Sequence, residues 1–167
     1  MKLVIDNSVA MRWLFADGSV ADRQYASEVA ALVENSEVHV PALFVTEAAN
    51  VISRALKVGL ISPQECESRF DLLNAMQASV DQLESTHSAM PLAIKAFEEG
   101  LSAYDATYLI LAKKLDCPLA TLDKDLRRAA KIVGLLLPYQ ASCKGQSRRL
   151  FTHRRQILRP TRACPDS

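Results

Sequence analysis

The chain lacks several features that would assign it to a common class. No uninterrupted apolar run approaches the roughly 18 residues of a transmembrane helix. The N-terminus does not have the basic-then-apolar design of a signal peptide. Neither G-x-x-x-x-G-K-[ST] nor G-x-G-x-x-G, the glycine-rich phosphate-binding motifs, occurs. These absences disfavour a membrane span, a secreted protein and a nucleotide-binding domain, and they predict a cytoplasmic location.

Cysteine and histidine are also sparse. The four cysteines lie far apart and form no C-x-x-C pair, and the three histidines have no zinc-ligand spacing. Scattered reduced thiols are therefore expected. No Ser-His-Asp or Cys-His arrangement stands near the acidic residues described below, so catalysis through a nucleophilic side chain is not expected.

What is present is typical of one globular domain with an appendage. The 167 residues are 49% hydrophobic and 23% charged. Residues 1–139 hold 13 Lys and Arg against 18 Asp and Glu, a charge of −5, whereas residues 140–167 hold 7 against 1, a charge of +6. We therefore expect a folded domain over 1–139 and a basic, flexible tail over 140–167. The tail is an RNA-binding arm, a solvated segment without a role, or vector- or frame-derived sequence.

Short apolar strands alternate with helical patterns along residues 1–139. The pattern predicts strands at 3–5, 38–40, 80–83, 119–122 and 134–137. It predicts helices at 8–15, 20–34, 42–57, from 63 onward, 88–99, 104–115 and 124–132. Such alternation is typical of an α/β fold with three layers, α/β/α. Its central parallel sheet would have four to five strands, covered by helices on both faces.

Four carboxylates occur where such a sheet would gather them. Asp6 and Asp123 directly follow predicted strands, and Glu47 and Asp105 lie in the first turns of apolar helices. The carboxyl ends of parallel strands and the adjacent helix starts line one crevice. Several carboxylates in one crevice repel one another unless a hard divalent cation binds there. The arrangement predicts a phosphoesterase that uses Mg²⁺ or Mn²⁺.

Each carboxylate also has a structural explanation. Asp6 fits an Asx-turn or a helix N-cap, and Asp123 fits the N-cap of the following helix. Glu47 is compatible with a solvated acid favoured by the helix dipole. Asp105 stands three residues after Ser102, which is capping-box spacing. The common location of all four at one edge of the sheet favours the functional reading.

Four motifs resemble, in order and spacing, those of the PIN-domain family. They are Asp6-Asn7-Ser8, Thr46-Glu47 with Asn50, Leu101-Ser102-Ala103-Tyr104-Asp105-Ala106, and Thr121-Leu122-Asp123. The nearest resemblance is to the VapC-type toxins of bacterial toxin–antitoxin pairs, and it covers residues 1–139. The tail departs from the pattern, because such toxins usually end near the last strand.

The resemblance implies a site and an activity. Asp6, Glu47, Asp105 and Asp123 would bind one or two Mg²⁺ or Mn²⁺ ions. The supporting polar residues would be Ser8, Asn50 and Thr121. The implied activity is that of an endoribonuclease leaving 5′-phosphate and 3′-hydroxyl ends. The implied partners are RNA and a small DNA-binding, VapB-like antitoxin that blocks the site.

Other readings remain beside this one. The main alternative is a catalytically inactive protein of the same fold that binds RNA or a partner. A receiver domain is disfavoured because Asp81 is poorly placed within its strand and no lysine follows the last strand. A haloacid-dehalogenase-type phosphatase is disfavoured because Ser8 stands where a second aspartate is needed.

Two further surfaces are predicted. Apolar stretches at 12–15 and 43–60 suggest a partner groove or a homodimer face, and core packing explains them equally well. A phosphate-binding flank is the second. Its six basic residues are Lys113, Lys114, Lys124, Arg127, Arg128 and Lys131.

Overall fold

A four-stranded parallel sheet forms the centre of the molecule. The computed structural model describes residues 1–81 and 89–139. The strands are β1 (Lys2–Ile5), β2 (Glu37–Pro41), β3 (Ser79–Asp81) and β4 (Leu119–Ala120), and they lie in the order β3-β2-β1-β4. The helices of the described residues are α1 (Asn7–Phe15), α2 (Val20–Val33), α3 (Leu43–Lys57), α4 (Pro63–Asn74), α5 (Ala89–Glu99), α6 (Ala103–Leu115) and α7 (Lys124–Ile132).

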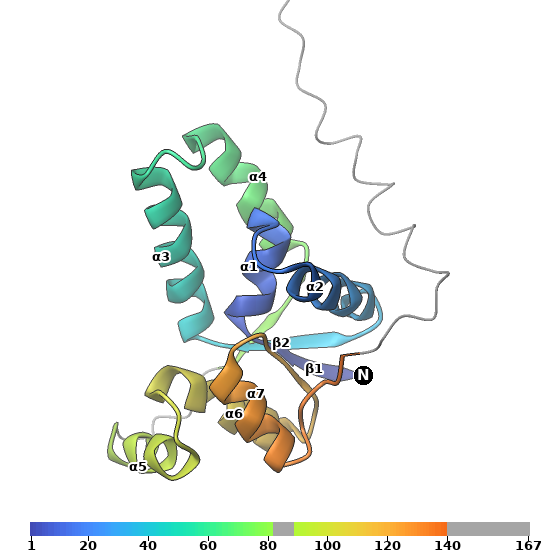
Figure 1. The fold of residues 1–167 in the computed structure, drawn as a ribbon, viewed down its shortest axis with the longest axis vertical. Coiled ribbons are helices and arrows are strands. Elements are labelled where there is room, and N and C mark those ends of the chain that lie inside the picture. Colours follow the sequence, from blue (N-terminus) through green and yellow to red (C-terminus); the bar gives the residue numbers. More distant parts are fainter. Residues whose placement is uncertain (82–88, 140–167) are drawn as a thin grey trace, which may run out of the picture.

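Helices cover both faces of this sheet. Figure 1 shows α1 to α4 on one side of the strands and α5 to α7 on the other. α6 packs directly against β1, β2 and β4, while α1 contacts α2, α3 and α4. The predicted three-layer α/β fold is therefore confirmed.

The central strand β1 explains where the first acidic residue lies. Leu3, Val4 and Ile5 are all completely buried, because a strand in the middle of a sheet covered on both faces has no solvated side. The strand pairs in parallel with β2 on one side and β4 on the other. Asp6 follows Ile5 immediately and is therefore carried to the carboxyl end of the sheet within the protein interior.

The C-terminal strands are shorter than the sequence predicts. β4 ends at Ala120 instead of 122, because the Asp123 amide donates to Thr121 Oγ1 (3.0 Å) and starts the turn into α7. The predicted strand at 134–137 reduces to one parallel bridge between Leu136 and Leu119. Pro138 follows and lacks an amide donor, which prevents further pairing. Of the predicted strand at 80–83, residues 82 and 83 lie outside the described part.

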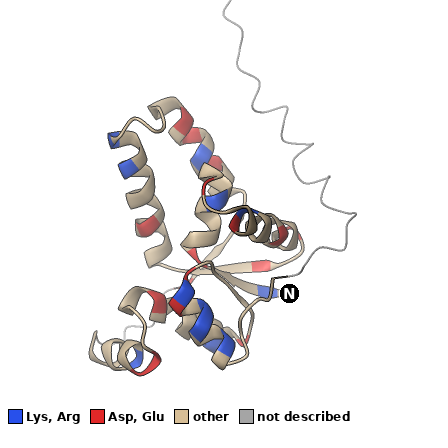
Figure 2. Ribbon diagram, in the orientation of Figure 1, with Lys and Arg blue, Asp and Glu red and all other residues tan. Residues whose placement is uncertain are grey.

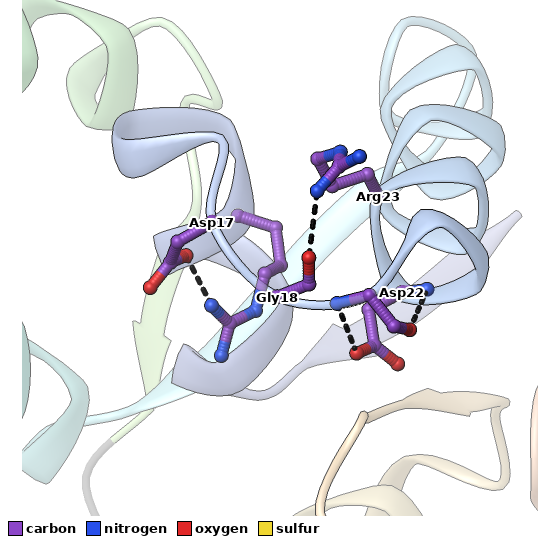
Figure 3. A network of polar contacts seen from close by, with 6 residues as sticks. Asp17, Gly18, Asp22 and Arg23 are labelled. Carbon is purple, nitrogen blue, oxygen red and sulfur yellow. Dashed lines mark hydrogen bonds and ion pairs between the residues drawn. The ribbon is translucent and has the colours of Figure 1, made fainter.

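The turn between α1 and α2 is held by a local polar network (Figure 3). Gly18 has φ +81°, and a side chain here would meet Arg12 at about 3.2 Å. The Gly18 carbonyl accepts from Arg23 Nη1 (2.6 Å), and Arg12 pairs with Asp17. Asp22 accepts from the Ser19 amide (3.0 Å) in a capping box that starts α2.

The two predicted apolar stretches behave differently. Within 12–15, Leu14 is buried and Trp13 Nε1 donates to the Ala26 carbonyl (2.7 Å), so this stretch belongs to the core. Within 43–60, by contrast, Val45, Val58 and Leu60 remain more than half exposed. None of the helices in the described part is long and apolar enough to cross a membrane.

Candidate active site

Asp6 is the most deeply buried of the four predicted acids. Its residue exposure is 6%, and its Oδ2 accepts hydrogen bonds from the Ser8 hydroxyl and from Thr121 Oγ1 (2.7 Å). Burial raises the pKa of Asp6 to about 6, against the lowering effect of these two hydroxyls. Glu47 and Asp105 raise this pKa further by repulsion. The two predicted supports Ser8 and Thr121 therefore do bind the predicted acid.

Glu47 projects from α3 into a second set of polar groups. Its Oε2 accepts from the Tyr108 hydroxyl and from Asn7 Nδ2 (3.4 Å). The same Asn7 amide donates to the Phe44 carbonyl (3.0 Å), while Asn7 Oδ1 is buried without a hydrogen-bond partner. The pKa of Tyr108 is raised, chiefly by burial and then by its bond to Glu47. Tyr108 is therefore a neutral donor that holds the Glu47 carboxylate.

Asp105 lies in the first turn of α6, beside its own cap. The Ser102 hydroxyl donates to Asp105 Oδ2 (2.6 Å) and accepts from the Asp105 amide (3.1 Å). Burial raises the pKa of Asp105, and repulsion from Asp123 and Asp125 adds to this effect. The capping role considered from the sequence is real, but the carboxylate also lies within the field of the other acids.

Asp123 is the N-cap of α7. Its Oδ1 accepts from the amides of Asp125 (2.9 Å) and Leu126 (2.8 Å). This is the structural role that the sequence allowed for it. The N-cap role leaves Asp123 available to the acid cluster, because the cap uses only one of the two carboxylate oxygens.

The four acids share one electrostatic environment, but each is turned onto its own donors. Among residues 1–81 and 89–139, no group of three or more His, Cys, Asp or Glu side chains is arranged to hold a metal ion. The donors present are nevertheless the hard oxygens that Mg²⁺ and Mn²⁺ prefer. The buried, unpaired Asn7 Oδ1 is another oxygen of this kind. In donor chemistry, these side chains fit a hard divalent cation.

Two residues of the site, Asn7 and Tyr108, were not among the site residues predicted from the sequence. Asn7, and not Asn50, hydrogen-bonds Glu47; Asn50 lies exposed on α3. Tyr108 lies within the apolar helix predicted at 104–115, and nothing in that pattern distinguishes it from a core residue. Its position one turn after Asp105 was the available signal, since residues three apart on a helix share a face.

The predicted basic flank divides between two helices. Lys113, on α6, forms an ion pair with Glu99 (2.7 Å). The four cations of α7 instead line one surface groove, and Figure 2 shows that helix as a largely basic segment. They are Lys124, Arg127, Arg128 and Lys131.

Comparison with known proteins agrees with this architecture. Residues 3–132 match the PIN domain. Ribonuclease VapC3 of Pyrobaculum aerophilum is 30% identical over 142 residues, which is 83% of this chain and 100% of that protein. The crystal structure of PAE2754 from Pyrobaculum aerophilum covers 77% of this chain and 84% of its own, with a TM-score of 0.53 and 20% identity, and supports the fold. The chain therefore belongs to the PIN-domain family, with a VapC ribonuclease among its relatives.

Proposed function

We propose that this protein is a metal-dependent endoribonuclease that hydrolyses RNA phosphodiester bonds. The observation that carries the proposal is the buried Asp6 carboxylate, held by two hydroxyls and repelled by Glu47 and Asp105. Burying a charged carboxylate beside two others is costly, and a bound cation would remove that cost. Membership of the PIN-domain family and similarity to a ribonuclease support the same reaction.

Asp6, Glu47, Asp105 and Asp123 are the residues proposed to hold one or two Mg²⁺ or Mn²⁺ ions. When bound, such an ion lowers the pKa of a coordinated water and offsets the charge of the scissile phosphate. The remaining work falls to the protein. Ser8 and Thr121 fix the orientation of Asp6 through the two bonds to Oδ2. Oriented ligands matter because the groups that hold them tune metal binding.

A second positioning system acts on Glu47. Tyr108 and Asn7 both donate to the same oxygen, Oε2. Because two donors use one oxygen, the other carboxylate oxygen keeps its acceptor capacity. Ser102 restrains Asp105 in the same way from the start of α6. These donors keep three of the four acids, Asp6, Glu47 and Asp105, in place before any substrate arrives.

The direct test is a cleavage time course on a single-stranded RNA, with Mg²⁺ or Mn²⁺ and then with EDTA. Cleavage should require the divalent ion and should leave 5′-phosphate ends, identified by ligation to an adaptor. Calcium should support little turnover, because it is larger and a weaker Lewis acid than magnesium. Full activity in EDTA would instead indicate a metal-free ribonuclease.

We propose further that the enzyme is the toxin of a cytoplasmic toxin–antitoxin pair, with a small DNA-binding, VapB-like protein as partner. The similarity to VapC3 supports this role. The exposed Val45, Val58 and Leu60 of the α3 region offer apolar surface for the antitoxin or for a second subunit of a homodimer. Induced expression should arrest growth, and co-expression of the protein encoded directly upstream should relieve the arrest. The same arrest by an Asp6→Asn variant would contradict the toxin role.

The nuclease domain is proposed to span residues 1–139, with 140–167 as a basic appendage. The family match ends at residue 132. The Tyr25 hydroxyl donates to the Leu137 carbonyl (3.0 Å), which ties the segment after α7 to α2. The alternative of an inactive RNA- or partner-binding protein predicts RNA binding without metal-dependent cleavage, so the time course above separates the two.

A further inference from the structure

Two hollows on the surface meet beside the acidic site. A groove of about 630 Å³ runs along α7, and a smaller hollow of about 270 Å³ lies between α2 and α7. Arg127 and Tyr139 line both hollows, so the two adjoin and are called here one path. None of the four predicted acids lines either hollow, which makes this path a surface separate from the acid cluster.

The smaller hollow is connected to Asp6 through single side chains. Leu122 lines this hollow, and its amide donates to Ser8 Oγ (2.9 Å), which in turn bonds Asp6. On the other wall, Arg127 Nη1 donates to the Thr121 carbonyl (2.9 Å), and the Thr121 hydroxyl bonds Asp6. A polymer bound in this hollow would therefore lie close to Asp6.

The charge of the groove is opposite to that of the acid cluster. Lys124, Arg127, Arg128 and Lys131 line the groove, and the basic stretch is visible on α7 in Figure 2. The one acid lining the smaller hollow is Asp22, whose carboxylate accepts from the Ser19 amide in the α2 cap (Figure 3). The path therefore suits a polyanion.

An aromatic platform stands where the two hollows meet. Tyr139 is 40% exposed and stacks on the buried Tyr25, with ring centroids 6.3 Å apart and an angle of 20° between the planes. Tyr25 is fixed from below by its hydroxyl bond to Leu137 and by the Arg127 guanidinium, 5.3 Å from the ring centroid. The exposed ring is thus held in place before any ligand binds.

We infer that this path binds the single-stranded RNA segment next to the scissile phosphate. An unpaired base stacks on Tyr139, Arg127 binds the adjoining phosphate, and the cations of α7 bind the phosphates that follow. Exposed aromatic rings beside Arg and Lys side chains are the usual means of holding unpaired bases. Bases in a duplex are already stacked and cannot use the platform. The inference rests on the proposed ribonuclease function and adds the surface outside the acid cluster that binds the substrate.

Binding in EDTA tests this without cleavage. The affinity of a fluorescently labelled RNA of about 12 nucleotides is measured for wild type, Tyr139→Leu and Tyr139→Phe. Loss of one stacked base should weaken binding by about fivefold to a hundredfold in Tyr139→Leu, while Tyr139→Phe keeps the ring and the affinity. Phe97→Leu removes a more exposed ring from α5 and should change nothing. Binding to the duplex of the same sequence should be unaffected by Tyr139→Leu.

The charge of the groove is tested with Lys124→Gln and Lys131→Gln, against Lys57→Gln at the end of α3. Each groove variant should reduce the slope of log affinity against log salt by about 0.7, and the control should not. If Tyr139→Leu binds as wild type does while the lysine variants weaken RNA and inorganic polyphosphate equally, the path recognises only negative charge and the inference is wrong. Unchanged slopes in both groove variants would overturn it as well.

Failure of the inference and failure of the proposed function give different results. Wild-type cleavage in Mg²⁺ with unchanged RNA affinity in Tyr139→Leu contradicts the platform alone. Absence of wild-type cleavage in any divalent ion, with the Tyr139 effect on binding intact, contradicts the ribonuclease assignment and leaves an RNA-binding protein.

Discussion

The hydroxyl of Thr121 donates a 2.7 Å hydrogen bond to Oδ2 of Asp6, although 115 positions separate the two residues in the sequence. The bond joins the ends of neighbouring parallel strands, β1 and β4. Thr121 Oγ1 also accepts from the Asp123 amide (3.0 Å), so this one side chain connects Asp6 to the start of α7. Thr121 is fully buried, so water cannot replace it.

Thr121→Val should lower RNA cleavage by about tenfold to a hundredfold, the usual effect of removing a group that orients a metal ligand. Valine keeps the shape of the threonine side chain, but Asp6 loses one of its two hydrogen-bond donors. The free energy of unfolding at pH 7 should fall by about 1–3 kcal/mol, because a buried acceptor is left with fewer partners. Thr121→Ser restores the hydroxyl and should recover most of the activity. Equal activities of the Ser and Val variants would show that the hydrogen bond has no positioning role.

The raised pKa of Asp6 predicts that the free energy of unfolding of the metal-free protein falls as the pH rises. The folded state holds the Asp6 proton up to about pH 6, whereas the unfolded state releases it near 3.8. The contribution of Asp6 protonation to the free energy of unfolding is therefore complete below about pH 4 and is lost as the pH rises through 6. Asp6→Asn cannot ionise, so its stability relative to wild type should rise by about 1–3 kcal/mol between pH 4 and pH 7.

Chemical denaturation in EDTA at several pH values measures this difference. Asp71→Asn, on the exposed surface of α4, is the matched control and should show no comparable change over the same range. A difference between Asp6→Asn and wild type that stays constant from pH 4 to pH 7 would show that Asp6 is already ionised in the folded protein at low pH.

Deletion of residues 140–167 should leave the fold and the cleavage of a short RNA nearly unchanged. The four predicted acids and the paired segment around Leu136 all precede the deletion. If the tail is an RNA-binding arm, the truncated protein should bind RNA more weakly and with a smaller salt slope, since arginine–phosphate contacts release counterions. Equal affinities and equal salt slopes would exclude the arm, and loss of folding would show that the domain extends beyond 139.

Local patterns predicted much of the fold because helix starts and buried strands are encoded by neighbouring residues. Examples are the strand before Asp6 and the helix starts predicted at 20 and 63, where the structure shows capping boxes at Ser19 and Ser62. The length of β4 was not predictable, because it ends where Thr121 bonds the Asp123 amide instead of continuing the ladder.

The sequence analysis named the four acids and the two hydroxyl donors of Asp6, Ser8 and Thr121, but not the two donors that hold Glu47. Tyr108 donates to Glu47 across 61 positions, a contact that depends on how α3 packs near α6. No local spacing encodes such a contact. Asn7 is adjacent to Asp6 in the sequence, yet its side-chain amide donates to Glu47 and to the Phe44 carbonyl at the start of α3. These partners lie about 40 positions away, so only the tertiary structure reveals them. The platform of Tyr25 and Tyr139 likewise joins α2 to the segment after α7.

The most direct test of the account compares RNA cleavage by wild type, Asp6→Asn and Asp105→Asn at saturating Mg²⁺, with Asp71→Asn as control. Each substitution removes a charge without removing volume, so circular dichroism should confirm an unchanged fold. The account predicts that both site variants lose more than about a hundredfold in cleavage rate, beyond the loss expected for a supporting residue. The control should cleave as wild type does. Cleavage near the wild-type rate by either site variant would contradict the proposal that these acids hold the catalytic metal.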